Sequence, residues 1–300
     1  MTPELTPKSD KATGQPVNPV AEWWAENPMT YADDHGSVTY EGVQVPFGSI
    51  EFFDRVDSTF LAWNKPLHFP APFGKIFDYQ KYQGKKVLEI GCGMGTMASL
   101  WAKSGADVTA VDLNPVAVET TKKRFDTFNL SGTVLRVDGK SLPFPDNHFD
   151  YVYSWGVLHH SPDLEKSLTE MFRVAKPSAG FGVMLYHRKS FLHWYMTEYI
   201  EGFLHRENKF LSPLELASRY GDGHREEGNP HTWPITRKEA TEMFKEHSQD
   251  VGIDTLGTEL DGLFKLMLPV VGMRLPRWAK KPWARRFGWS LWISGHKATV

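Results

Sequence analysis

The sequence predicts an α/β protein whose doubly wound, mostly parallel β-sheet has helices on both faces. Between residues 85 and 188, apolar runs of strand length alternate regularly with amphipathic segments of helix length. Three glycines follow the first apolar run at every second position, Gly91, Gly93 and Gly95, where a strand must turn sharply into a helix. Such alternation is typical of parallel sheets, because each parallel connection needs a crossover segment.

Turn and capping residues set the expected positions of these elements. The first helix ends at Gly105, and the second begins after Asn114, a good N-cap, with Pro115 at its first position. Strands are expected at 85–90, 106–113, 132–139, 149–160, 180–188 and 289–298. Helices are expected at 95–105, 114–129, 163–177, 191–204 and 236–247.

The regular core accounts for only part of the 300 residues. Residues 1–20 are polar and proline-rich, which predicts a disordered lead segment. Residues 21–80 carry many aromatic side chains without strand alternation, and we expect them to form a helical cap or lid. Residues 81–300 are expected to form the main domain. An insert at about 189–235 follows the fifth strand and includes the polar loop 221–234.

Composition argues against several functional classes. The formal net charge of −2 gives no general attraction for polyanions, so no nucleic-acid partner is expected. Cys92 is the only cysteine, which excludes an internal disulfide and a cysteine-built metal site and favours a cytoplasmic location. No metal-ligand cluster of convincing spacing is evident, and no apolar run approaches the roughly 20 residues of a membrane span.

The glycine turn distinguishes between two cofactor classes. A nicotinamide-binding turn has the pattern G-x-G-x-x-G, which requires glycine where this chain has Thr96, so a nicotinamide-dependent oxidoreductase is disfavoured. The actual pattern, E-x-G-x-G-x-G from Glu89, resembles motif I of the class I S-adenosylmethionine-dependent methyltransferases. The stretches VDGKSLPFPDNHFDYVYS (137–154) and SWGVLHHSPDLEKSLTEMFRVAKP (154–177) resemble later motifs, the second of them in the methyltransferase type 11 subfamily. The resemblance covers about residues 85–186.

This resemblance implies a Rossmann-like fold that binds S-adenosyl-L-methionine and releases S-adenosyl-L-homocysteine. Asp112, at the end of the second strand, would hold both ribose hydroxyls, because one carboxylate offers two acceptor oxygens to a vicinal diol. Asp138 would accept from the adenine amino group, and Gly139 would offer its backbone amide to the ring. The cofactor-binding residues implied by the resemblance are Glu89, Gly91, Cys92, Gly93, Gly95, Asp112, Leu113, Asp138, Gly139, Ser154 and Trp155.

The expected reaction is an in-line methyl transfer to a small-molecule acceptor, and the sequence leaves open whether an O, S, N or C atom accepts. Enzymes that methylate exocyclic base amines carry N/D-P-P-Y/F after the fourth strand, where this chain has SWGV (154–157). His159 and His160 are candidate general bases or packing residues, and Trp155 is a candidate to face the sulfonium or to fill the core. Candidate acceptor contacts in the predicted lid and polar loop are Tyr31, His224, Arg225, Asn229, His231 and Thr232.

Two further points stay open at this stage. A non-catalytic S-adenosylmethionine-binding or scaffold protein is an alternative, although such a protein would be expected to lose cofactor residues that this chain keeps. The segment 264–292 mixes tryptophan with arginine and lysine, a composition suited to a membrane surface or a lipophilic substrate. The competing expectation is a cap packed on the sheet with its basic side chains in water.

Overall fold

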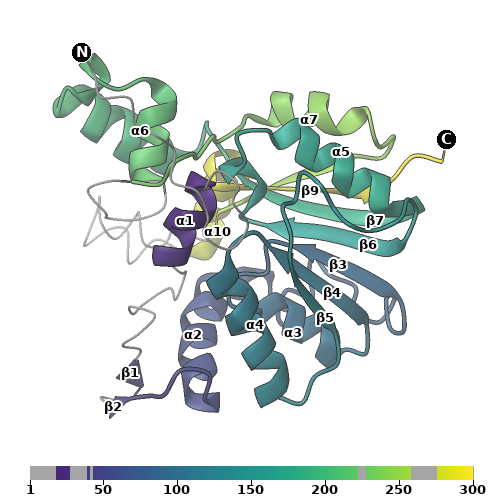
Figure 1. Ribbon diagram of the computed structural model, residues 1–300. Helices are drawn as coiled ribbons and strands as arrows, with labels where there is room; N and C mark the ends of the chain where they lie inside the picture. The colour runs from purple at the N-terminus through teal and green to yellow at the C-terminus, as the bar shows by residue number, and fades with distance from the viewer. Residues whose placement is uncertain (1–17, 28–38, 41–42, 222–227, 258–275, 300) are drawn as a thin grey trace.

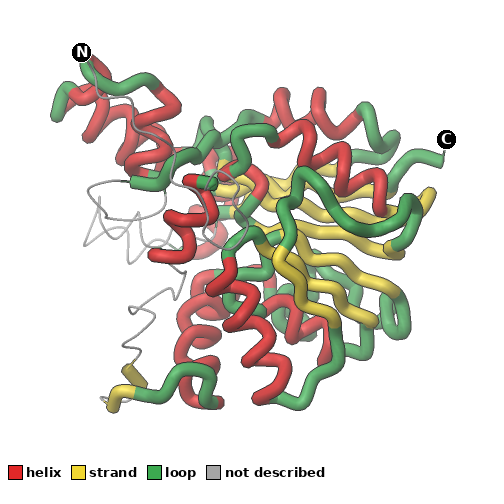
Figure 2. The backbone as a smooth tube through the Cα atoms, in the orientation of Figure 1, coloured by secondary structure: helices red, strands yellow, loops and turns green. Residues whose placement is uncertain are grey.

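A computed structural model of the chain describes residues 18–27, 39–40, 43–221, 228–257 and 276–299 (Figure 1). A seven-stranded sheet forms its central layer, with helices on both sides (Figure 2). The strands of this sheet are β3 (Lys86–Ile90), β4 (Asp107–Asp112), β5 (Thr133–Arg136), β6 (Phe149–Trp155), β7 (Ala175–Tyr186), β8 (Gly252–Leu256) and β9 (Ser290–His296). A separate two-stranded hairpin pairs β1 (Thr39–Tyr40) with β2 (Val43–Gln44).

The strands lie in the order β5-β4-β3-β6-β7-β9-β8. The first five are mutually parallel, and β9 runs antiparallel to both β7 and β8. The prediction of a doubly wound, mostly parallel sheet is confirmed. Strand order reverses at β3, which has β4 on one side and β6 on the other. The carboxyl ends of such a pair of strands border a crevice in which ligands bind in open α/β sheets.

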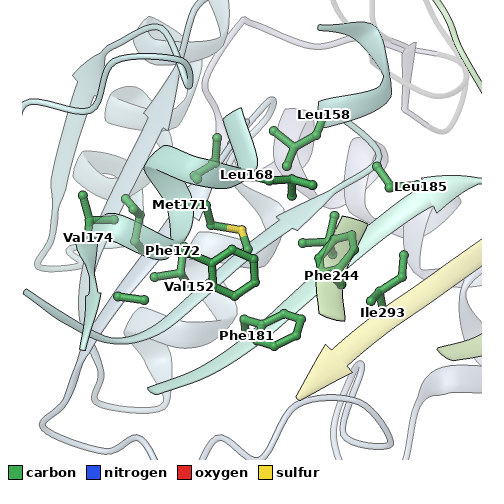
Figure 3. Packing of buried hydrophobic residues seen from close by; sticks show 14 of the residues in the cluster. Val152, Leu158, Leu168, Met171, Phe172, Val174, Phe181, Leu185, Phe244 and Ile293 are labelled. Atoms are coloured by element: carbon green, nitrogen blue, oxygen red, sulfur yellow. The ribbon is translucent and has the colours of Figure 1, made fainter. Parts of the chain in front are cut away.

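Helices cover the two faces of the sheet through separate apolar clusters. On one face, α5 (Leu164–Val174) and α7 (Arg237–Lys245) pack Leu168, Met171 and Phe244 against β6, β7 and β9 (Figure 3). On the other face, α2 (Ile50–Trp63), α3 (Thr96–Lys103) and α4 (Pro115–Thr127) meet the sheet in a second cluster that contains Phe60 and Trp101. Parallel strands covered on both faces are buried on both faces, as β3 is from Val87 to Ile90.

Hydrogen bonds at helix starts explain why these helices begin where they do. The Asn114 side chain accepts from the Val116 N–H at the start of α4, as the sequence predicts. Helix α7 begins with a capping box, in which Thr236 and Glu239 satisfy each other's backbone N–H groups.

Several elements differ from the sequence-based expectations. Residues 193–204, expected as an ordinary helix, form a π-helix, η3 (His193–Leu204). The structure adds α1 (Pro19–Glu26), α6 (Pro213–Tyr220), α10 (Arg277–Phe287) and strand β8. Short 3₁₀ turns lie at η1 (Lys65–Leu67), η2 (Leu158–His160) and η4 (Glu207–Lys209). Most of the predicted lead segment, residues 1–17, lies outside the described residues. Within the described part of the chain, no helix is both long and apolar enough to cross a bilayer.

Candidate active site

The turn between β3 and α3 consists of left-handed backbone at every second residue. Gly91, Gly93 and Gly95 have φ angles of +85°, +52° and +73°, a region in which other side chains are strained. At Gly91, an added Cβ would also lie 2.3 Å from Cγ2 of Val157, which follows β6. The glycines therefore let the turn approach the segment that continues from the neighbouring strand.

Asp112 ends β4 directly beside this turn. Its Oδ2 accepts a hydrogen bond from the Gly93 N–H, and its Oδ1 accepts one from the Asn114 N–H, both at 2.9 Å. Burial raises the pKa of Asp112, and these backbone donors oppose the rise. A carboxylate has about four lone-pair positions. Asp112 can therefore hold the turn and still accept from two ligand hydroxyls.

Glu89 lies near the end of β3, the strand next to β4, and is 2% exposed. Its Oε2 has no hydrogen-bond partner among the described residues. Burial raises the pKa of Glu89 well above its ordinary value, and the nearby charge of Asp112 raises it further. A cationic or hydrogen-bond-donating ligand stabilises a buried carboxylate of this kind. The unpartnered oxygen therefore fits the positively charged cofactor that the sequence resemblance implies.

Four other predicted cofactor residues lie in three places around the turn. Asp138 and Gly139 follow β5, and Asp138 is tied down by the Lys140 N–H, which donates to its Oδ1 at 2.9 Å. Ser154 is buried, and its hydroxyl donates to the Ile90 carbonyl at 2.8 Å. Gly95 is the N-cap of α3, so its contribution is to the shape of the turn.

Cys92 is buried, and burial followed by the charges of Asp112 and Glu89 raises the pKa of its thiol well above the ordinary value. The thiol therefore stays protonated near neutral pH, which removes the thiolate that a nucleophile needs.

A cavity of about 1440 Å³ lies at the carboxyl edge of the sheet. The lining residues at the carboxyl ends of β3, β4 and β5, here called the polar end, include Glu89, Gly91, Cys92, Gly93, Asp112, Leu113, Asp138 and Gly139. The lining residues from α1, β6, η2, β7, the insert and β8, here called the apolar end, include Val20, Ala21, Trp155, Leu158, Met184, Leu192 and Leu256. Lys65, His68 and Lys75 also line the cavity. The volume exceeds the roughly 300–1000 Å³ of a typical small-molecule site. It can therefore hold a cofactor and a second molecule together.

Helix α1 contributes to one wall of this cavity and connects its two ends. The Asn114 side-chain amide donates to the Trp24 carbonyl at 2.8 Å, next to Asp112. The Trp24 ring meets the His160 ring edge to face, with centroids 5.1 Å apart. Asn18, Val20 and Ala21 also line the cavity. The predicted lid residue Tyr31 lies outside the described residues. Other residues of the predicted cap, between Phe60 and Lys75, line the cavity together with α1.

The two histidines after β6 occupy different environments. His160 lines the cavity, and its Nδ1 lies 3.1 Å from the His231 carbonyl oxygen and 3.0 Å from Thr232 Oγ1. His159 is 1% exposed and does not line the cavity, and its ring packs at a tilt against Tyr186 with centroids 3.9 Å apart. Burial, and then the charges of His160 and His231, lower the pKa of His159 well below its ordinary value. His159 is therefore a neutral packing residue by its placement.

The polar loop contacts His160 through the backbone carbonyl of His231 and the side chain of Thr232. Asn229 donates from Nδ2 to Thr232 Oγ1 at 2.5 Å, and Thr232 in turn contacts His160. Neither Asn229 nor His231 lines the cavity with its side chain. His224 and Arg225 lie outside the described residues.

Trp155 combines the two roles left open by the sequence. It lines the cavity, and its ring also packs against Phe73 and Trp292, with centroids 5.2 and 5.7 Å away.

A buried ion pair, which the sequence does not predict, holds the glycine turn through hydrogen bonds to Met94 and Thr96. Arg124 of α4 is fully buried and bonds both carboxylate oxygens of Asp57 in α2, at 2.8 and 2.9 Å. It also donates to the Met94 carbonyl at 2.7 Å and to Thr96 Oγ1 at 3.2 Å. The pair thus joins α2 to the turn. An arginine within a helix carries no pattern that marks it as buried.

Comparisons with known proteins agree with this geometry. A family profile described as a methyltransferase domain matches residues 88–182. A sterol 24-C-methyltransferase of Aspergillus fumigatus is 33% identical over 144 residues, which cover 47% of this chain and 35% of that protein. The chain thus spans only about a third of this relative. A ubiquinone biosynthesis O-methyltransferase of Nitrosospira multiformis is 30% identical over 166 residues, which cover 51% of this chain and 68% of that enzyme.

Solved structures show the same fold at lower identity. An S-adenosylmethionine-dependent methyltransferase from Methanosarcina mazei superposes with a TM-score of 0.50 at 19% identity, covering 73% of this chain and 96% of that one. At this identity the likeness concerns the fold alone. Because the Nitrosospira relative matches over two thirds of its own length, and the profile covers the strands and turns that build the cavity, the chain belongs to the class I S-adenosylmethionine-dependent methyltransferases, in the methyltransferase type 11 group.

Proposed function

We propose that the protein transfers a methyl group from S-adenosylmethionine to a small, largely apolar acceptor that binds beside the cofactor. The cavity carries this proposal, because it joins a polar end built by Glu89, Asp112 and Asp138 to an apolar end in one continuous space. The names of two relatives support an apolar acceptor, since one acts on sterols and the other in ubiquinone biosynthesis.

The residues at the polar end fit the cofactor by their chemistry. Asp112 has lone pairs left for the ribose diol after its two backbone bonds, and Asp138 lines the next part of the cavity. Glu89 has an unpartnered oxygen for a cationic or donor group. When bound, S-adenosylmethionine supplies an electrophilic methyl group on a sulfonium centre.

The hydrogen bonds of His160 favour an acceptor that carries a hydroxyl group. A carbonyl oxygen can only accept, so the contact with the His231 carbonyl places the proton of a neutral ring on Nδ1. His160 also lines the cavity, where the acceptor binds in this proposal. It acts as a general base that takes the proton of the acceptor hydroxyl. Thr232 and the His231 backbone hold the ring in this tautomer.

The first experiment tests binding and turnover together. Calorimetry with S-adenosylhomocysteine and with nicotinamide nucleotides should show binding of the former alone. Radiolabelled methyl donor, offered with lipophilic phenols and alcohols and with matched thiols and amines, should label the hydroxyl compounds. Binding of S-adenosylhomocysteine without transfer to any compound would favour the non-catalytic alternative. Preferential labelling of thiols or amines would contradict the role of His160.

The second experiment isolates the base. His160→Gln should lower turnover by about 10²–10⁴-fold while the Kd for S-adenosylhomocysteine changes little. His159→Gln is the matched control in the neighbouring packing position. It should lower the thermal stability and preserve turnover per folded molecule. If both variants keep full turnover, the proposed base is wrong.

A further inference from the structure

A row of aromatic side chains covers one side of η3 and the turn before it. Phe191, Trp194, Tyr195, Tyr199 and Phe203, here called the aromatic ladder, stack at ring-centroid distances of 5.6 to 6.1 Å. The π-helix favours this arrangement, because its i→i+5 hydrogen bonds bring residues four and five apart onto one side.

Three of the ladder rings, and two apolar residues that follow them in the chain, are exposed to solvent, whereas Phe191 and Tyr195 are half-buried. The exposed fractions are 46% for Trp194, 39% for Tyr199 and 61% for Phe203, and they rise to 84% for Phe210. Leu204, which lies between Phe203 and Phe210 in the sequence, is 50% exposed. Contiguous apolar surface of this kind on a folded chain marks an interaction site more often than isolated exposed residues do.

The second half of helix α10 supplies a second, basic surface. The last turn of the helix carries Arg285 and Arg286. Arg285 and Arg286 are exposed, and Trp283 is 54% exposed. A helix that combines positive charge with an exposed tryptophan suits the headgroup region of an anionic bilayer, where amphipathic rings and cations both find partners.

Hydrogen bonds and a ring contact join the residues that follow α10 to the residues that precede and begin η3. The His187 N–H donates to the Trp289 carbonyl at 2.6 Å, and His187 Nδ1 lies 3.1 Å from the Gly288 carbonyl oxygen, just past the end of α10. At the start of η3, the His193 ring lies 6.3 Å from the Trp289 ring. Both segments also reach the cavity, through Leu192 and Ala284.

We infer that the aromatic ladder and α10 together dock the protein on the surface of an anionic lipid bilayer. The ladder enters the interface, and α10 provides the attraction to anionic headgroups, since η3 itself carries Glu198 and Glu201. A second copy of the chain fits less well, because a symmetric contact would oppose one basic α10 to another. Nucleic acid also fits less well, because the ladder rings turn their faces toward one another, with interplanar angles of 16–27°, whereas bases stack on free faces.

The test is sedimentation of the full chain with vesicles of phosphatidylcholine alone or with about 30% phosphatidylglycerol. Binding should be stronger to the anionic vesicles and should fall with salt. The double variant Arg285→Glu/Arg286→Glu should weaken binding to anionic vesicles about 30-fold or more. Trp194→Ser and Phe203→Ser should each weaken binding to both vesicle types about tenfold.

Matched controls lie away from the proposed surface. Lys122→Glu/Lys123→Glu, an exposed basic pair on α4, and Ile50→Ser, a 51% exposed residue at the start of α2, should leave vesicle binding unchanged. None of the ladder or α10 test residues lines the cavity, so methyl transfer to a soluble acceptor should be unaffected.

The outcomes separate this inference from the proposed function, because sedimentation requires no methyl transfer. No vesicle binding by the wild type overturns the inference, as does equal binding by all variants. A dimer that the same variants abolish, without vesicle binding, would assign the surface to a second copy instead. Retention on single-stranded nucleic acid without vesicle binding would assign it to a polyanion.

Discussion

Removing Asp57 should destabilise the fold, because Arg124 would then be a buried charge without its ion-pair partner. In Asp57→Ala, the guanidinium of Arg124 loses two charge-assisted hydrogen bonds at 2.8 and 2.9 Å and stays fully buried. Its bonds to the Met94 carbonyl and Thr96 remain. Breaking a buried ion pair from one side costs about 3–5 kcal/mol, because the uncompensated charge cannot reach water. For a chain of this size, that loss lowers Tm by about 6–15 °C.

The companion variants show whether the charge is the cause. Arg124→Met/Asp57→Ala removes both charges and fills most of the same volume, so it should be less destabilised than the sum of the two single variants by about 1–3 kcal/mol. Asp54→Ala, at an exposed acidic position of the same helix α2, should change the free energy of unfolding by no more than about 0.5 kcal/mol.

Urea titrations of the four variants measure these differences, and calorimetry with S-adenosylhomocysteine follows the site. The affinity of Asp57→Ala should fall, because the pair supports the glycine turn. An Asp57→Ala protein within about 1 kcal/mol of the wild type, or strict additivity in the cycle, would refute the reasoning.

Three further predictions follow from the site and the insert. Asp112→Ala should weaken S-adenosylhomocysteine binding about 10- to 100-fold in calorimetry, and unchanged affinity in a folded protein would contradict its role. Gly91→Ala should lower stability and affinity more than Gly84→Ala, because both have positive φ but only the first would place Cβ against Val157; equal effects would refute this. Burial lowers the pKa of His193 from 6.5 to about 4. Between these pH values the unfolded chain binds a proton that the folded chain does not. The free energy of unfolding should therefore fall by about 1.4 kcal/mol per pH unit as the pH drops from 6.5 to 4. His193→Gln should flatten that slope in urea titrations, and an unchanged slope would assign it to other groups.

The core of the fold could be predicted from the sequence because its signals are local. Continuous apolar strands, the N-cap at Asn114 and the glycine turn each show their structure within a few residues. Strand β8 escaped prediction because none of its residues is fully buried, so no buried apolar run marks it. Helix α6 carried a usable signal, since Ser212 and Glu215 form a capping box around a proline at the first turn. Helix α10 is not evident from the sequence, because Pro282 lies inside it and proline disfavours a helix interior.

The cofactor half of the site could be predicted for the same reason, and the acceptor half could not. Asp112 and Asp138 follow strands at positions that a motif fixes. The apolar end of the cavity combines α1, the start of the insert at Leu192, the residues after β8 and Ala284 of α10. No spacing in the sequence relates these segments, because only the folded sheet brings them together. The contact of His160 with Thr232 likewise joins residues 72 positions apart.

The position of β9 has a consequence for the synthesis of the chain. Strand β8 is made before β9 but joins the sheet only through it, because β9 lies between β7 and β8. Once β7 has left the ribosome, its outer edge waits for its partner while roughly one hundred further residues are translated, which takes about 5–20 s at ordinary rates. During that interval the edge of β7 presents open backbone hydrogen-bonding groups beside Phe181 and Val183, residues buried in the finished core. A nascent chain halted before Leu291 should therefore recruit chaperones that recognise extended apolar segments, and the released 300-residue chain should not.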